Sequence, residues 1–289
     1  MTPEHSKRDR NIPPPPATGT SAAPPAGASV NVESCIWNLP LAAPPVPSPS
    51  EEYVGRLSKA LEEMRPSAAF IDLDMTLVDT SQVYTELEIA TCGHFGFDNA
   101  NEVRKKHYEL QSLAGHEIMN GLFNLGRAHG AFTRTSFDDF YAHFHALVAQ
   151  LRAGTLPLEL NLEPLPGARD CLDLLRAADV PAIVTTGSAR PLANWFLERG
   201  NFSDYFAPDC VVCAGEYAPT KATPEFWRPL VIEYRKVIGL EDNVEAAGWM
   251  LENGVDHVFL RNWRKESSDA LRKLYGNRFT EVSCWRKLL

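Results

Sequence analysis

The chain has 289 residues, 44% of them hydrophobic, with a formal net charge of -9 and a pI near 5.4. This length allows a substantial buried core, as one large domain or two modest ones. The acidic balance argues against partners such as nucleic acid or an anionic membrane, because both attract a basic surface. Residues 1–10 are polar, unlike a secretory signal, and no later run of about 18 apolar residues could span a bilayer. We therefore expect a cytoplasmic protein whose main partner is a small molecule.

Residues 1–49 form a tail rich in proline and alanine that holds 12 of the 22 prolines. Such a composition cannot offset its ordering entropy by burial, so we expect the tail to be disordered. A plain linker is the favoured interpretation, and the alternative is a proline-rich ligand for an aromatic-lined groove of a protein partner. Ser50 is a typical N-cap for a helix that contains Leu57 and Leu61 and ends at Pro66.

From residue 68 onward, short apolar runs alternate with helical stretches. Residues 68–71 form a run that stops abruptly at two aspartates, which is typical of a buried parallel strand. Similar runs occupy residues 181–184, 211–212, 237–238 and 255–260, and helical stretches occupy residues 168–177 and 189–199. This alternation predicts an α/β fold with a doubly wound, Rossmann-like parallel sheet.

Residues 80–160 interrupt the alternation. The segment has helical periodicity and aromatic-rich pieces but no evident strand, so we expect an α-helical cap inserted into the sheet domain. The predicted catalytic core then consists of residues 50–79 and 161–289.

Two carboxylates, Asp72 and Asp74, lie two residues apart just beyond the first predicted strand. Both can serve one site, because the chain there has left strand geometry, and one can attack a substrate while the other transfers a proton. A carboxylate attacks an anionic phosphate only if a cation neutralises the repulsion, and hard oxygen ligands favour magnesium over zinc. The alternative is an ordinary aspartate-rich turn.

Three later features favour a phosphate site over such a turn. Residues 184–188 place hydroxyls and a glycine where a strand meets a helix, and backbone N–H groups bind phosphate oxygens at such positions. Lys221 precedes a helix that starts near Pro224 and can neutralise both the phosphate and the nucleophile. Glu241 and Asp242 follow another predicted strand and offer carboxylates to a metal. Each feature is weak alone, because capping hydroxyls, solvated lysines and acidic turns are common.

In this order the features resemble the four motifs of the haloacid dehalogenase superfamily. Residues 70–80, FIDLDMTLVDT, resemble the first motif. Thr185 resembles the second motif, Lys221 the third, and the acidic pair at residues 241–242 the fourth. The resemblance extends from residue 68 to the C-terminus and is to the phosphatase and β-phosphoglucomutase branch, whose helical cap follows the first motif. Met75 departs from the pattern, because many members have glycine there.

The resemblance implies a Mg²⁺-dependent phosphatase that forms a phosphoaspartate intermediate. Asp72 would be the nucleophile, and Asp74 would protonate the leaving alcohol and then activate water. The other catalytic or phosphate-binding residues would be Thr76, Thr185, Thr186, Gly187 and Lys221. The Mg²⁺ ligands would come from Asp72, Asp74, Glu241 and Asp242.

Two alternatives stay open from the sequence. A phosphomutase of the β-phosphoglucomutase type shares every catalytic residue named, and a cap that excludes water would favour it. The alternative from another class is a catalytically idle binding or scaffold protein that recruits a partner through its proline-rich tail. The apparently complete set of catalytic residues argues against this second alternative.

Cysteine and histidine pairs offer weaker candidates. Six cysteines without a dense framework suggest reduced thiols. Cys210 and Cys213 have the spacing of a redox pair, but the strand-like residues between them favour buried cysteines. His143 and His145 could form a metal pair, yet no third ligand is evident, so packing or exposure in the cap is favoured.

Overall fold

A computed structural model describes residues 55–110, 115–156, 162–218 and 220–289, and the structural statements below refer to these residues. The predicted proline-rich tail, residues 1–49, and the predicted N-cap Ser50 lie outside them. The described part begins with α1 (Arg56–Met64), which buries Leu57 and Leu61 as the helical spacing predicted.

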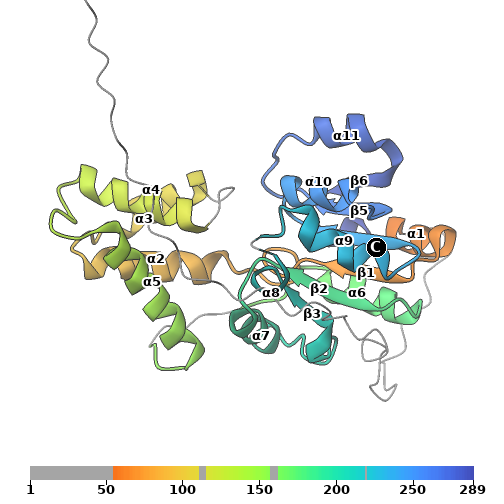
Figure 1. Ribbon diagram of the computed structural model, residues 1–289, viewed down its shortest axis with the longest axis horizontal. Coiled ribbons are helices and arrows are strands. Elements are labelled where there is room, and N and C mark those ends of the chain that lie inside the picture. The colour runs from red at the N-terminus through yellow and green to blue at the C-terminus, as the bar shows by residue number, and fades with distance from the viewer. Residues whose placement is uncertain (1–54, 111–114, 157–161, 219) are drawn as a thin grey trace, which may run out of the picture.

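Six parallel strands form one sheet in the order β3-β2-β1-β4-β5-β6 (Figure 1). Their bounds are β1 (Ala68–Ile71), β2 (Ala182–Thr186), β3 (Val211–Cys213), β4 (Val237–Glu241), β5 (His257–Arg261) and β6 (Phe279–Val282). The chain runs outward from β1 to β3, returns to lie beside β1 as β4, and then runs outward in the other direction. This order confirms the doubly wound α/β fold and places its topological switch point between β1 and β4.

Helices cover both faces of the sheet, so side chains of β1 alternate between two cores. Ala69 and Ile71 belong to the core under α1, α6 and α7. Ala68 and Phe70 belong to the core under α9, α10 and α11. A strand buried on both faces is continuously apolar, which is why this strand is visible in the sequence. The bounds of these helices are α6 (Ala168–Ala177), α7 (Arg190–Arg199), α9 (Pro224–Ile232), α10 (Val244–Glu252) and α11 (Asp269–Tyr275).

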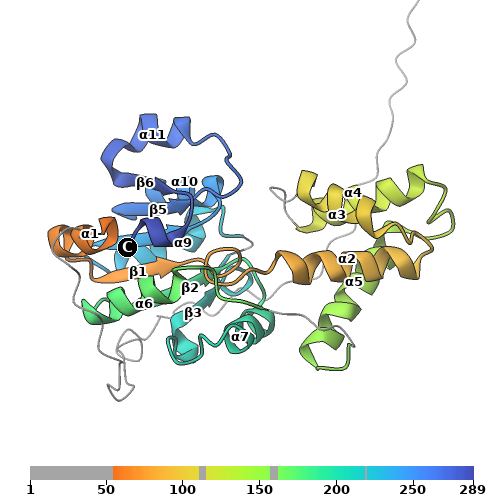
Figure 2. The ribbon, with the colours of Figure 1, turned by 180° about the vertical axis from the view of Figure 1, so that it is seen from behind.

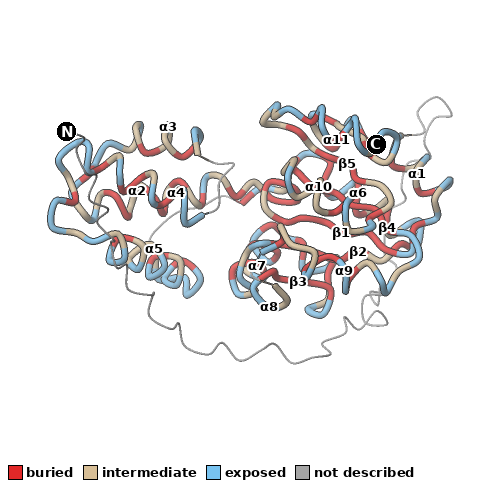
Figure 3. The backbone as a smooth tube through the Cα atoms, turned by 45° about the horizontal axis from the view of Figure 1, so that its top comes forward, coloured by how far each residue is buried: buried red, intermediate tan, exposed pale blue. Residues whose placement is uncertain are grey.

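Between β1 and β2 the chain leaves the sheet and forms a group of four helices (Figures 1 and 2). They are α2 (Ser81–His94), α3 (Ala100–Leu110), α4 (Gly115–Ala128) and α5 (Phe137–Arg152). Part of this group packs around its own aromatic core, which contains Phe123, Phe132 and Phe140. Leu87 of α2 and Leu147 of α5 instead belong to the core of the sheet domain that lies under α1, α6 and α7. We call these four helices the cap, and Figure 3 shows that its helices turn buried residues toward one another.

The two segments that join the cap to the sheet domain lie side by side. The N–H of Leu165 donates to the Leu77 carbonyl at 2.8 Å, and the N–H of Asp79 donates to the Glu163 carbonyl at 3.2 Å. The chain therefore enters and leaves the cap at one place, just beyond the carboxyl end of β1.

Short elements complete the described chain. They are α8 (Ala214–Tyr217) and the 3-10 turns η2 (Pro208–Cys210), η3 (Gly276–Arg278) and η4 (Trp285–Lys287). Among the described residues, no helix combines the length and apolar character needed to cross a membrane.

Cys210 and Cys213 are both buried, as the sequence analysis favoured. Cys213 is a buried free thiol, whereas Cys210 is disulfide-bonded, so these two residues do not pair with each other. The expectation of reduced thiols is therefore wrong for Cys210. In the cap, the ring of His143 stacks on His94 with the centroids 3.8 Å apart, a packing contact rather than a metal pair with His145.

Candidate active site

Carboxylates meet at the switch point because β1 and β4 end side by side. Asp72 directly follows β1, and its N–H donates to the Leu240 carbonyl of β4 at 2.9 Å, which extends the ladder by one residue. Carboxylate oxygens of Asp72, Glu241 and Asp242 all lie within 4.8 Å of one another. All three side chains are buried. We call this group the carboxylate cluster.

Lys221 lies between two members of the carboxylate cluster. Its Nζ donates to Asp72 Oδ1 at 2.6 Å and to Glu241 Oε2 at 2.9 Å. The buried indole of Trp227 on α9 donates to the Lys221 carbonyl at 2.7 Å and fixes the backbone there. Burial lowers the pKa of Lys221, but the two carboxylates outweigh burial and raise it overall, so the ammonium group stays charged.

Glu241 has protein donors on both of its carboxylate oxygens. Oε2 accepts from Lys221, and Oε1 accepts from the backbone N–H groups of Asp242 and Asn243, each at 3.2 Å. Burial, followed by the charge of Asp72, raises the pKa of Glu241. These contacts make Glu241 an anchor for Lys221.

The loop after β5 orients Asp242. The Trp263 indole N–H donates to Asp242 Oδ2 at 2.9 Å, and Arg264 Nη2 lies 3.6 Å from the same oxygen. Burial and the charge of Asp72 raise the pKa of Asp242. Trp263 and Arg264 are not predictable as site residues from the sequence, because a tryptophan and an arginine after a strand form no recognisable motif.

Hydroxyl donors surround Asp74. Its Oδ2 accepts from Thr186 Oγ1 at 3.1 Å and from Ser188 Oγ at 2.9 Å, and its Oδ1 accepts from the Tyr84 hydroxyl at 3.3 Å. Desolvation and the charge of Asp72 raise the pKa of Asp74, which the hydroxyl donors partly offset. A raised pKa favours the neutral carboxyl group, the form that can donate a proton. Tyr84 is a further residue that the sequence analysis missed.

The turn after Asp74 is fixed from two distant parts of the chain. Met75 has a positive φ of 58°, a left-handed conformation that favours glycine. Arg261 donates to the Met75 carbonyl at 2.8 Å, and the Trp285 indole donates to the Thr76 carbonyl at 2.6 Å. These donors hold the turn in place although its left-handed position carries a side chain.

Two buried hydroxyls beside these carboxylates have no partner within the described protein. Thr185 Oγ1 in β2 and Thr76 Oγ1 in the turn are both fully buried and unpaired. Buried hydroxyls are hydrogen-bonded as a rule, so each of these two atoms is available to an oxygen of a water or a ligand. Thr186 differs, because its hydroxyl is engaged by Asp74. Gly187 lies exposed in the following turn, where an added Cβ would meet no atom within 4 Å.

The carboxylate cluster fits a divalent cation. Three buried carboxylates face two cationic groups, the Lys221 ammonium and the Arg264 guanidinium, which still leaves excess negative charge in a site built from hard oxygen ligands. Such ligands suit Mg²⁺. Across the described ranges, this is the one group of three or more acidic, histidine or cysteine side chains close enough to hold a metal.

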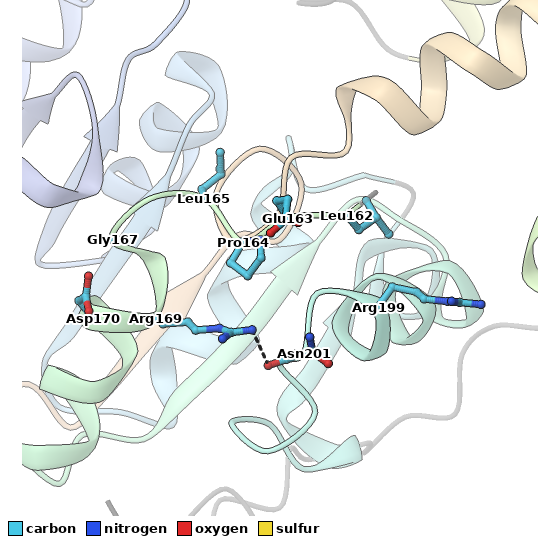
Figure 4. Close-up of a pocket in the computed structure, with 9 residues that line it drawn as sticks. All are labelled: Leu162, Glu163, Pro164, Leu165, Gly167, Arg169, Asp170, Arg199 and Asn201. Atoms are coloured by element: carbon cyan, nitrogen blue, oxygen red, sulfur yellow. Dashed lines mark hydrogen bonds between the residues drawn. The ribbon is translucent and has the colours of Figure 1, made fainter. Parts of the chain in front are cut away.

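The structure also has a cavity of about 530 Å³, whose lining residues are drawn in Figure 4. It is bounded by the second cap linker, residues 162–165, and by the neighbouring ends of α6 and α7. Arg169 crosses one side and donates to the Asn201 carbonyl at 3.5 Å. No member of the carboxylate cluster lines this cavity, so the cavity and the carboxylate cluster are separate features of the structure.

The fold and the site together define an α/β enzyme with a carboxylate centre at the switch point of its sheet. Residues 69–257 match the family model of the haloacid dehalogenase-like hydrolases. The chain belongs to this family, which confirms the predicted membership and the prediction of an enzyme.

Solved structures show the same fold at low sequence identity. A Thermotoga maritima protein assigned as a β-phosphoglucomutase is 20% identical with a TM-score of 0.56, over 77% of this chain and 96% of that chain. A haloacid dehalogenase hydrolase (family IA, variant 3) from Entamoeba histolytica is 12% identical with a TM-score of 0.57, over 77% and 95%. A mutant of CbbY from Rhodobacter sphaeroides, in complex with xylulose 1,5-bisphosphate, is 15% identical with a TM-score of 0.54, over 77% and 96%. A comparison with curated proteins gives no match.

Proposed function

We propose that the chain is a Mg²⁺-dependent phosphatase that hydrolyses a small phosphomonoester through a phosphoaspartate on Asp72. The observation that carries this proposal is the contact of Lys221 with Asp72 at 2.6 Å beside the carboxylate of Asp242. This contact brings the proposed nucleophile, the Lys221 ammonium group and a proposed metal ligand together at the carboxyl edge of the sheet. The unpaired hydroxyl of Thr185 supports a phosphate position next to them. The cytoplasmic location and the domain boundaries at residues 80 and 160 stay predictions.

The residues present fit a Mg²⁺ ion. Asp72 and Asp242 would hold it with their carboxylates and Asp74 with its backbone carbonyl, while Glu241 anchors Lys221. When bound, Mg²⁺ would neutralise the phosphate charge that otherwise repels a carboxylate.

In the first step, a carboxylate oxygen of Asp72 forms a bond to phosphorus while the bond from phosphorus to the ester oxygen breaks. Asp74 in its neutral form gives its proton to the departing alcohol oxygen. Lys221 and the hydroxyl of Thr185 interact with the transferring phosphoryl oxygens. The raised pKa of Asp74 supports its role as the proton donor.

In the second step, a water oxygen attacks phosphorus and gives its proton to the Asp74 carboxylate. The bond between phosphorus and the Asp72 oxygen breaks, which releases inorganic phosphate and restores both aspartates. The donors Thr186 and Ser188 hold Asp74 between the two steps. The same two aspartates, Asp72 and Asp74, therefore act in both steps.

The direct test is an assay of phosphate release from 4-nitrophenyl phosphate and a phosphometabolite panel, with and without Mg²⁺. We expect Mg²⁺-dependent release that falls by at least about a thousandfold in Asp72→Asn, because the amide cannot form the acyl phosphate. Asp138→Asn, an exposed change on α5, is the matched control and retains activity.

Two other results would contradict the phosphatase. Isomerisation of a sugar phosphate without net phosphate release would establish the phosphomutase alternative, in which a second sugar replaces water as the acceptor. No turnover on any substrate would favour the binding or scaffold protein.

A further inference from the structure

Tyr84 connects the cap to the proton-transferring aspartate. It lies in the first turns of α2, and its hydroxyl is 3.3 Å from Asp74 Oδ1 and 3.3 Å from Ser188 Oγ. Its ring packs edge-on against Phe196 of α7, with the centroids 6.1 Å apart. One side chain of the cap therefore touches both the turn after β1 and the turn after β2.

The Thr80 hydroxyl, just before α2, also donates to Asp74, and the three other donors divide between its two oxygens by their origin. Oδ2 is held by Thr186 and Ser188, which both belong to the sheet domain. Oδ1 is held by Tyr84, which belongs to the cap. Among the contacts of the described residues, the cap thus reaches the Asp74 carboxylate through Tyr84.

The direction of these hydrogen bonds follows from counting protons. Ser188 uses its one hydroxyl proton on Asp74 Oδ2, so it can only accept from Tyr84. Tyr84 then donates its own proton to Asp74 or to Ser188. A phenol is protonated at neutral pH, so Tyr84 has this proton to donate.

We propose that Tyr84 is a positioning residue that aims the Asp74 carboxyl group from the cap and so couples the seating of the cap to protonation of the leaving group. This inference rests on the proposed phosphatase function. Without the hydroxyl of Tyr84, Asp74 keeps the donors Thr80, Thr186 and Ser188 but loses the one that α2 supplies, so its carboxyl group is less firmly oriented toward the leaving oxygen. A poorly oriented Asp74 slows the reaction most where the leaving group is basic and needs a proton to depart.

The experiment compares two aryl phosphates whose leaving groups differ in basicity. In Tyr84→Phe, we expect kcat/KM for phenyl phosphate to fall about tenfold and kcat/KM for 4-nitrophenyl phosphate to fall less than about twofold. The quantity kcat/KM is used because it reports the steps up to departure of the alcohol. Tyr108→Phe, an exposed tyrosine on α3, is the matched control and should change neither value.

A second variant separates the orienting hydrogen bond of Tyr84 from the packing of its ring. Tyr84→His keeps a ring and an N–H donor. We therefore expect it to restore part of the kcat/KM for phenyl phosphate that Tyr84→Phe loses relative to 4-nitrophenyl phosphate. If Tyr84→Phe does not fold, the same two substrates are compared in Tyr84→Leu, which also lacks the hydroxyl, since a loss of stability alone would not change the ratio of the two kcat/KM values.

The outcomes distinguish this inference from the proposed function. Equal losses for both substrates, or no loss, in a protein whose wild type is Mg²⁺-dependent and whose Asp72→Asn variant is inactive, would overturn the role of Tyr84 alone. Wild type without Mg²⁺-dependent turnover would overturn the proposed function and this inference with it.

Discussion

The aspartates of the active site share a residue type but not an environment. Asp72 contacts an ammonium group, Lys221, whereas Asp242 contacts the indole of Trp263. Asp74 contacts neutral hydroxyl groups instead. These different surroundings suit identical side chains to the different roles that we propose for them, as nucleophile, metal ligand and proton donor.

Trp263 offers a test of how Asp242 is oriented. Trp263→Phe keeps a ring but removes the N–H that donates to Asp242 Oδ2. We expect Mg²⁺ affinity to fall about tenfold, because a ligand that is no longer oriented binds its metal less well. At saturating Mg²⁺, kcat should stay within about twofold of the wild-type value. Titrations of activity and of melting temperature with Mg²⁺ both measure this affinity.

Trp249→Phe on α10 is the matched control and should leave Mg²⁺ affinity unchanged, because Trp249 lies outside the carboxylate cluster. Equal affinities of wild type and Trp263→Phe would show that Asp242 needs no help from the loop after β5.

Sequence order was enough to select the residues that the structure brings together. Two of them, Asp72 and Asp242, follow recognisable strands, and Lys221 precedes a recognisable helix. The carboxyl ends of parallel strands share one edge of the sheet, so residues at these positions are expected to meet. Tyr84 and Trp263 were not foreseen, because each acts through a single polar atom on a large ring, and its partner is fixed only by tertiary packing.

Secondary-structure elements were predictable where burial is complete on both faces. The central strand β1 is buried at every position and so appears as an unbroken apolar run. The edge strand β6 was missed, because Thr280 and Glu281 at its centre are only partly buried and interrupt the apolar pattern. The helix bounds within the cap were also not derivable, since its periodicity is diluted by aromatic side chains on several faces.

At the start of α6, the fold depends on a residue without a side chain. Gly167 has a φ of +88°, and an added Cβ would lie 2.7 Å from the Arg286 nitrogen and 3.0 Å from Trp285. We expect Gly167→Ala to lower the free energy of unfolding by about 2 to 4 kcal/mol, from left-handed strain plus overpacking. Denaturant unfolding measures this loss.

Gly130→Ala separates the two causes. Gly130 also has a positive φ, +79°, but an added Cβ there meets no atom within 4 Å. It should lose only the backbone contribution of about 1 kcal/mol. Equal losses in the two variants would mean that the contact with residues 285–286 does not constrain α6.

On the scale of the whole molecule, the candidate active site lies at the carboxyl ends of β1 and β4. Figures 1 and 2 show that the cap joins the sheet domain beyond β1. Paired cap linkers beside β1 bring α2 to the carboxyl ends of the strands. The site therefore takes its carboxylates and lysine from the sheet domain and Tyr84 from the cap. Because the site is divided in this way, we propose that the position of the cap affects proton transfer by Asp74 in the sheet domain.

The stability of the protein should depend on pH through the carboxylate cluster. Without a metal, burial and the charge of Asp72 raise the pKa of Asp242 to about 7. A raised carboxyl pKa stabilises the folded state below the unfolded value of about 4, and this contribution is lost as pH rises through the folded value. We therefore expect the metal-free protein to lose stability from acid to neutral pH. Mg²⁺ binds the ionised carboxylates, so its stabilising effect should grow over the same interval.

Melting temperatures recorded across this pH range with Mg²⁺ and with a chelator measure both effects. Asp242→Asn is the control variant, because it removes the titrating group and should abolish most of the pH-dependent gain from Mg²⁺. A gain from Mg²⁺ that is the same at every pH would contradict this account of the cluster.

The covalent intermediate is the central claim, and its most direct test is acid-quenched mass spectrometry of the enzyme during turnover of 4-nitrophenyl phosphate with Mg²⁺. We predict one phosphoryl group on the peptide that contains Asp72, labile to hydroxylamine as an acyl phosphate is, and none in Asp72→Asn. Phosphoryl label on another residue, or full turnover in Asp72→Asn, would contradict the assignment of Asp72 as the nucleophile.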